Sequence, residues 1–168
     1  MPHHSRMPNN SIFKMLALAF TASAGLLAQA GFTARDIRGT YTFSFTGTLV
    51  RAATGAPIPV AAVGVFTLDG EGKVTKSTRV LNVAGQVVRE TATGTYTVNS
   101  EGVGSATFTV LPVEGEPAVV PPTREVFYFA MASRRVGVAI SGSIVAANGQ
   151  DIGLLSIVKS DFVRQEEP

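Results

Sequence analysis

The chain has 168 residues, of which 45% are hydrophobic and 15% charged, with a formal net charge of +2 and with no cysteine or tryptophan. Its two histidines, His3 and His4, both lie within the first thirty residues. Residues 31–168 therefore exclude a Ser-His-Asp triad, a cysteine nucleophile and histidine-ligated zinc, and they predict neither a metal site nor a cofactor.

The first thirty residues are typical of a secretory signal peptide. Arg6 and Lys14 form a positive lead, an apolar run follows at 15–27, and the tripeptide AQA at 28–30 supplies small residues two apart. The alternative is an uncleaved anchor, but the run is short for the roughly 20 residues of a spanning helix. We expect cleavage after residue 30, a secreted or periplasmic location and no integral membrane domain afterwards.

Loss of this segment would leave a chain without excess charge. Arg6 and Lys14 account for the surplus, and residues 31–168 hold equal numbers of basic and acidic side chains. A nucleic-acid partner therefore has no electrostatic support. The expected organisation is a signal peptide at 1–30, an N-terminal arm at 31–38, one β-barrel domain at 39–160 and a flexible C-terminal tail at 161–168.

After residue 38 apolar and polar residues alternate with the period of a β-strand. At 40–50, for example, Tyr41, Phe43 and Phe45 share one face, and threonine and serine occupy the other. Further strands are expected at 60–69, 73–83, 86–98, 103–111, 124–132, 136–146 and 151–160. Eight consecutive antiparallel strands predict a single all-β, eight-stranded up-and-down barrel. A sandwich is the alternative, and apolar inner faces disfavour an outer-membrane barrel.

The tetrapeptide GTYT occurs twice, at 39–42 and at 94–97. If residues 100–102 form a three-residue hairpin loop with its glycine in the left-handed conformation, Tyr96 pairs with Ala106. Large residues would then face small ones on the concave side of a curved sheet. The pattern favours a packing role for the repeated tyrosine over a catalytic one.

Two other turns set expectations for the rest of the barrel. A two-residue turn at Asn148-Gly149 would place Ile140 opposite Ile157. The long segments at 51–59 and 112–123 should lie at the same end of the barrel, because successive loops of a meander alternate between ends. That end would be a mouth for ligand entry, unless the lengths are neutral variation.

Arg79 and Glu90 form a candidate ion pair. If Ala84-Gly85 is a two-residue turn, the two residues face each other across the hairpin. Without a bulge, Glu90 shares the inward face of Tyr96, and the pair lies inside the barrel. A single bulge would turn both outward into a solvated pair, and this outward arrangement is the favoured interpretation because registers read from sequence are insecure.

Several of these motifs together resemble a known pattern. They are Gly39-x-Tyr41-x-Phe43, Val63-Gly64-x-Phe66-x-x-Asp69-Gly70, and GTYTVN at 94–99 followed by Gly102-x-Gly104. The pattern resembles that of uncharacterised secreted bacterial β-barrel proteins, whose fold is similar to allene oxide cyclase and lipocalin-like (calycin) barrels. The resemblance implies a hydrophobic cavity that holds a lipid-like molecule, and it transfers no functional residue.

Three functions are compatible with these features. The first is an exported barrel that binds a small hydrophobic ligand, with Arg79, Glu90, Tyr41, Tyr96 and Tyr128 as candidate ligand-binding residues. The second is an isomerase or cyclase of the allene oxide cyclase kind, although the sequence shows no nucleophile–base pair and no catalytic residue is assigned. The third is a structural or assembly module with a filled barrel.

A homo-oligomer is also expected, because 124–132 and 151–160 are apolar on both faces. One face can line the barrel. A partner subunit, or the arm at 31–38, would cover the other.

Overall fold

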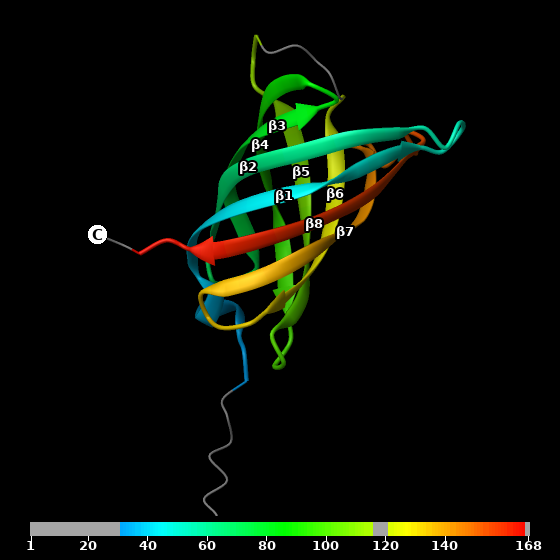
Figure 1. Ribbon diagram of the computed structural model, residues 1–168. Helices are drawn as coiled ribbons and strands as arrows, with labels where there is room; N and C mark the ends of the chain where they lie inside the picture. Colours follow the sequence, from blue (N-terminus) through cyan, green and yellow to red (C-terminus); the bar gives the residue numbers. More distant parts are fainter. Residues whose placement is uncertain (1–30, 116–120, 167–168) are drawn as a thin grey trace, which may run out of the picture.

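The computed structural model describes residues 31–115 and 121–166, so the expected signal peptide lies outside the described residues. Each strand pairs antiparallel with the next, and β1 also pairs with β8, which closes the barrel (Figure 1). The predicted all-β up-and-down barrel is confirmed, and the sandwich alternative is wrong. The elements are a short 3-10 helix, η1 (Ala34–Ile37), followed by β1 (Gly39–Arg51), β2 (Pro57–Leu68), β3 (Lys73–Val83), β4 (Gln86–Val98), β5 (Val103–Pro112), β6 (Thr123–Met131), β7 (Val136–Ala146) and β8 (Leu154–Arg164). None of the helices in the described ranges is long and apolar enough to cross a membrane.

The last strand corrects the expected boundary between barrel and tail. β8 begins at Leu154, not at 151, and continues to Arg164, so residues 161–164 belong to the barrel and not to a flexible tail. Phe162 is buried in the core and pairs with Phe43 of β1. The alternation simply continues: Val158, Ser160 and Phe162 point inward.

The hairpin registers near tight turns agree with expectation. Gly102 has a φ of 82°, and Tyr96 pairs with Ala106 as predicted. At the β3–β4 turn both Ala84 and Gly85 have positive φ, which is the geometry of a primed two-residue turn. The amide of Gly85 donates to the side chain of Asn82 and completes this turn.

The predicted register of the last hairpin is wrong by two residues. Ile140 pairs with Lys159, not with Ile157. The expected two-residue turn at Asn148-Gly149 is replaced by a three-residue loop, in which the amide of Gly149 donates to the carbonyl of Ala146 and Gly149 has a φ of 86°. A further turn follows it, in which the amide of Gly153 donates to Asp151. Beyond Ile140 the backbone ladder stops, and the Ser141 hydroxyl donates to the Ser156 carbonyl and accepts from the Val158 amide.

Alternation divides each strand into an inner and an outer face, and the inner side chains form two core clusters. One cluster lies around Tyr41, Tyr96 and Phe162, and the other around Phe45, Leu81 and Val88. Phe43 and Phe127 contact both clusters. The inner side chains therefore form two packed regions along the barrel, and the second is built on β1–β4 with Val158 of β8.

The arm at 31–38 closes one end of the barrel, the lower end in Figure 1, where η1 lies. Ile37 is fully buried there, and the amide of Phe32 donates to the carbonyl of Ser100. The hydroxyls of Tyr41 and Tyr96 donate to the carbonyls of Ile37 and Ala34, at 3.0 and 3.3 Å. The two GTYT tyrosines therefore hold the helix that plugs this end, in addition to their packing role.

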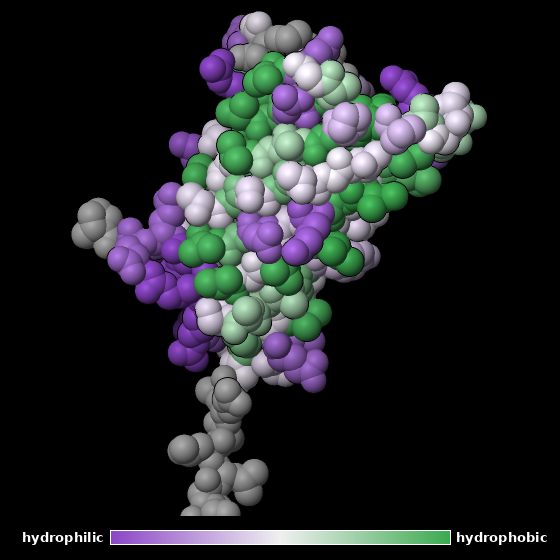
Figure 2. All heavy atoms as spheres, in the orientation of Figure 1, coloured by the Kyte–Doolittle hydropathy of each residue, from purple (hydrophilic) through white to green (hydrophobic). Residues whose placement is uncertain are grey.

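The arm consequently does not cover the outer face of β6 and β8. On the face seen in Figure 2, apolar side chains stand among polar ones along β1, β8 and β7. The most exposed large apolar residues include Tyr128, Ile140, Leu155 and Ile157, each more than half exposed. Tyr128 pairs directly with Ile140 across β6 and β7.

Candidate functional site: an interior cavity with a buried ion cluster

The barrel interior contains a cavity of about 80 Å³. By a criterion of roughly 10–15 Å³ for one water, this space holds several waters or one small ring compound. Ile37 of the plug forms part of its wall, and Tyr96 lies beside it. The wall also includes seven phenylalanines: Phe43, Phe45, Phe66, Phe108, Phe127, Phe129 and Phe162.

A second, smaller cavity of about 30 Å³ has a more polar wall that includes Ser141, Ser143 and Ser156. These serines belong to the parts of β7 and β8 that approach the other end of the barrel, which we call the mouth. The mouth carries the connections β1–β2, β3–β4, β5–β6 and β7–β8. The β1–β2 and β5–β6 connections, which were expected to share one end of the barrel, therefore both lie at the mouth. Arg79 and Glu90 line both cavities, so they lie between the two spaces.

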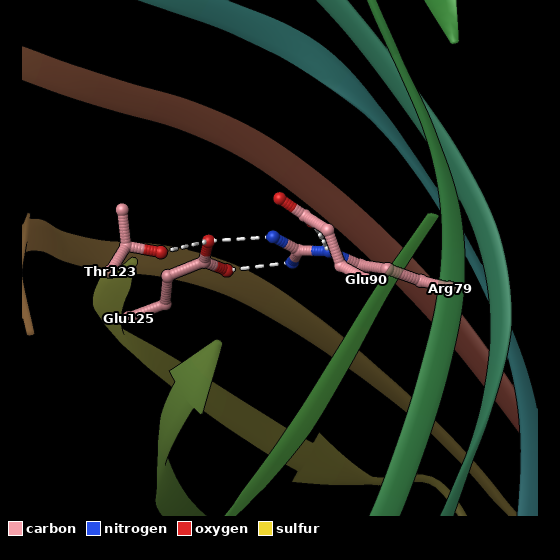
Figure 3. A network of polar contacts seen from close by, with 4 residues as sticks. All are labelled: Arg79, Glu90, Thr123 and Glu125. Atoms are coloured by element: carbon pink, nitrogen blue, oxygen red, sulfur yellow. Dashed lines mark hydrogen bonds and ion pairs between the residues drawn. The ribbon is translucent and has the colours of Figure 1, made fainter. Parts of the chain in front are cut away.

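Arg79, Glu90 and Glu125 form a buried ion cluster (Figure 3). The Nε of Arg79 donates to Oε2 of Glu90 at 2.6 Å, while Nη1 and Nη2 donate to the two oxygens of Glu125, both at 2.7 Å. The hydroxyl of Thr123 donates to Oε1 of Glu125. The three ionic side chains are only 10%, 6% and 9% exposed. The paired carboxylate and guanidinium planes of Glu125 and Arg79 give a strong, oriented contact.

The favoured expectation that Arg79 and Glu90 point outward is wrong. They pair directly across β3 and β4 and both point into the barrel. A bulge does occur in β3, but it lies between Val74 and Ser77. The register of β4 with β5 is continuous from Glu90 to Tyr96, so Glu90 stays on the inward face of Tyr96.

Glu125 was missed by the sequence analysis, although a signal for it was present. Thr123 and Glu125 continue the inward alternation of Phe127, Phe129 and Met131 toward the start of β6. A carboxylate on an otherwise apolar inner face indicates a buried partner. The partner itself could not be read from the sequence, because β3 and β6 are not adjacent in the sheet.

Burial and charge act in opposite directions in this cluster. Burial raises the pKa of Glu90, and the neighbouring Arg79 only partly opposes that effect. Burial disfavours the charged form of Arg79, but the carboxylates of Glu125 and Glu90 outweigh it and raise the pKa of Arg79. The guanidinium therefore stays charged, and the carboxyl group of Glu90 holds a proton more readily than an exposed glutamate does.

The three candidate tyrosines lie in different places. Tyr96 lines the cavity, whereas Tyr41 is fully buried beside it, stacked on Phe66 with ring centroids 5.2 Å apart. Burial raises the pKa of Tyr41 to about 12, so its hydroxyl remains a donor to the plug. Tyr128 is 55% exposed on the outer face, which rules out a role inside the barrel. The alternation that turns Phe127 and Phe129 inward necessarily turns Tyr128 outward.

We expect the free energy of unfolding to fall as the pH rises above about 4.3, the ordinary pKa of a glutamate, and to fall less in Glu90→Gln. Because burial raises the pKa of Glu90, the folded chain keeps this proton at pH values where the unfolded chain, with a glutamate pKa near 4.3, has released it. The stability from this group is therefore complete at lower pH and is lost as the pH rises through the folded pKa.

Urea unfolding of both proteins across this range measures the difference, with Glu101→Gln as the exposed control. Hydrogen bonds from Thr33 lower the pKa of Asp36, and hydrogen bonds from backbone amides lower that of Asp69. The contributions of these two aspartates to stability change with pH only below about pH 4, outside the range tested. Parallel pH profiles for wild type and Glu90→Gln would contradict the prediction.

Comparisons with known proteins leave the chain without a family. No protein-family model matches it, and the search of curated proteins finds no significant relative. Among solved structures, the chain is similar to one described as "Structure of EF1p2_mFAP2b bound to DFHBI", with 13% identity and a TM-score of 0.45. The match covers 80% of this chain and 100% of that chain. This likeness is too distant to transfer a ligand or a role to any residue here, and the resemblance to allene oxide cyclases stays a prediction.

Proposed function

We propose that this protein binds a small hydrophobic molecule inside its barrel. The observation that carries the proposal is the aromatic-lined cavity of about 80 Å³. Apolar side chains beside an unfilled space lose dispersion contacts, and an apolar ligand would restore them. Such a cavity supports a binding protein over a structural module with a filled barrel.

The two ends of the barrel differ in a way that supports entry through the mouth. Ile37 and the hydrogen bonds from Tyr41 and Tyr96 hold the plug in place at the closed end. At the mouth, the smaller cavity leads to Arg79 and Glu90, which also line the larger one. A ligand that enters there meets the ion cluster before the aromatic wall.

The test is to incubate purified residues 31–168 with a lipid extract and identify retained molecules by native mass spectrometry. Ala92→Leu adds volume to the cavity wall and should reduce retention. Ala61→Leu makes the same change at an exposed position of β2 and should retain the molecules as wild type does. If wild type retains nothing, the binding proposal is wrong.

A second candidate function is an isomerase or cyclase of the allene oxide cyclase kind. The raised pKa of Glu90, next to an apolar cavity, favours a proton-transfer role for this carboxyl group. Conversion of a retained molecule, and loss of that conversion in Glu90→Gln, would distinguish catalysis from binding alone.

Export is the expected route to the site of action, and the exported protein should begin at Gly31. The small residues at 28–30 follow a short apolar run, as signal peptidase requires. Intact-mass measurement of the protein recovered from the periplasm or medium tests this. A mass that includes residues 15–30 would contradict cleavage at this site.

We further propose that the outer faces of β6, β7 and β8 bind a second copy of the chain. Tyr128, Ile140 and Ile157 are each more than half exposed there, and burying them against a partner would remove apolar surface from water. We expect sedimentation equilibrium at high concentration to give a mass above that of the monomer. Ile157→Lys should shift it toward the monomer, whereas Val87→Lys, at an exposed position of β4, should not. A monomeric wild type would end this proposal.

A further inference from the structure

The ion cluster inside the barrel carries more negative than positive charge. Arg79 is bonded to both Glu90 and Glu125, and all three side chains are nine-tenths buried or more. Arg79 is the only cationic side chain among the described residues that line the two cavities. With both carboxylates ionised, one negative charge has no cation of its own, and a buried charge without a partner is costly.

One oxygen of the cluster is also free to accept a hydrogen bond. Glu90 accepts from Arg79 through Oε2, and no described residue donates to its Oε1. In Figure 3 no dashed line reaches this oxygen. Every buried side-chain oxygen or nitrogen in the described ranges has a hydrogen-bond partner. Because Oε1 has none, it is not enclosed by protein atoms and must border one of the cavities that Glu90 lines. The excess charge and the free acceptor therefore belong to the same side chain.

We propose that the ligand is a small apolar amine whose ammonium group donates to Oε1 of Glu90 while its apolar part occupies the aromatic cavity. This inference rests on the binding function proposed above and specifies its ligand class. An ammonium group supplies the missing positive charge, and a charge-assisted hydrogen bond is stronger than a neutral one. The phenylalanine rings around the cavity also favour a positively charged ligand, because the face of an aromatic ring attracts cations.

A carboxylate ligand, such as a fatty acid, fits this site poorly. Arg79 is the only cationic side chain among the described residues that line the cavities. Three of the five N–H groups of its guanidinium are already donated to Glu90 and Glu125. A further anion would add a second unpaired charge to the cluster. The interior therefore selects against the acid and for the amine.

Four probes of similar size separate these contributions: ethylbenzene, 2-phenylethanol, 2-phenylethylamine and phenylacetate. Each is titrated at pH 7 into wild-type residues 31–168, and binding is followed by amide ¹H–¹⁵N shifts of cavity-lining residues. We expect the amine to bind about tenfold tighter than ethylbenzene, with the alcohol between them. Phenylacetate should bind more weakly than ethylbenzene.

The series also separates failure of this inference from failure of the binding function. If none of the four probes shifts the cavity signals, the proposed binding of small hydrophobic molecules fails for compounds of this size. If ethylbenzene binds but the amine binds no tighter, or phenylacetate binds best, the binding function stands and the amine class is wrong.

Glu90→Gln removes the acceptor charge and should abolish the advantage of 2-phenylethylamine over ethylbenzene. Glu101→Gln removes one negative charge from an exposed loop and should leave that advantage unchanged. An amine preference that survives in Glu90→Gln would show that the cation is not held by this side chain. If Glu90→Gln does not fold, the ranking of the four probes by the wild type decides the question by itself.

Discussion

Arg79→Met should lower the free energy of unfolding by about 3–5 kcal/mol, which would be among the largest effects of any single substitution in this chain. The substitution leaves Glu90 and Glu125 without their cation in an interior where their side chains are only 6% and 9% exposed. Urea unfolding followed by circular dichroism measures the loss. The matched control is Arg135→Met, because Arg135 pairs with Glu166 at the surface, where both side chains are more than half exposed. That change should cost less than about 1 kcal/mol.

The reason for the loss can be separated from simple loss of packing. Replacing Arg79 by methionine and both glutamates by leucine removes every charge of the cluster and should recover much of the stability. Replacing only Arg79 and Glu90 should recover less, since Glu125 would still be buried without a cation. Equal stability of this double variant and the triple variant would contradict the three-residue cluster.

Tyr41→Ala should also cost about 3–5 kcal/mol. Its ring is fully buried, stacked on Phe66 and edge-on to Phe162, and its hydroxyl holds the carbonyl of Ile37 in the plug. The alanine variant would lose both the ring contacts and this hydrogen bond. Tyr41→Phe keeps the ring and loses only the donor, which should cost about 1 kcal/mol.

Tyr128 is the natural control, because it is the same residue type on the outer face of the same barrel. Tyr128→Ala should cost less than about 1 kcal/mol, as expected for an exposed side chain. Thermal or urea unfolding of the three tyrosine variants gives the comparison. A similar loss for Tyr41→Ala and Tyr128→Ala would rule out the proposed role of the first GTYT motif.

Those parts of the fold that depend on neighbouring residues could be predicted from the sequence. A glycine with positive φ at 102 fixes the β4–β5 register, and the Ala84-Gly85 turn places Arg79 opposite Glu90. In both hairpins the paired strands are joined by a tight turn, so local turn chemistry determines which residues meet.

Features that depend on distant strands or on several weak turns could not be predicted. Glu125 meets Arg79 only because the barrel curves β6 around to face β3 across its interior. In the last hairpin, the extra turn at Asp151 and the serine bridge at Ser141 shift the register by two residues without any strong sequence signal. The inward direction of the Arg79–Glu90 pair depended on β4 running without a bulge from Glu90 to Tyr96, and the sequence does not show which strand carries a bulge.

The pairing of β1 with β8 has a consequence for how the chain acquires its structure. Tyr41 pairs with Arg164 across this seam, so the barrel cannot close until residues 154–164 have left the ribosome. Until then β1 and β7 both present unpaired edges, which invite pairing with other chains. Long-range pairing of this kind also slows folding. The nascent polypeptide therefore stays open until its last strand emerges, and early chaperone protection is valuable during that interval.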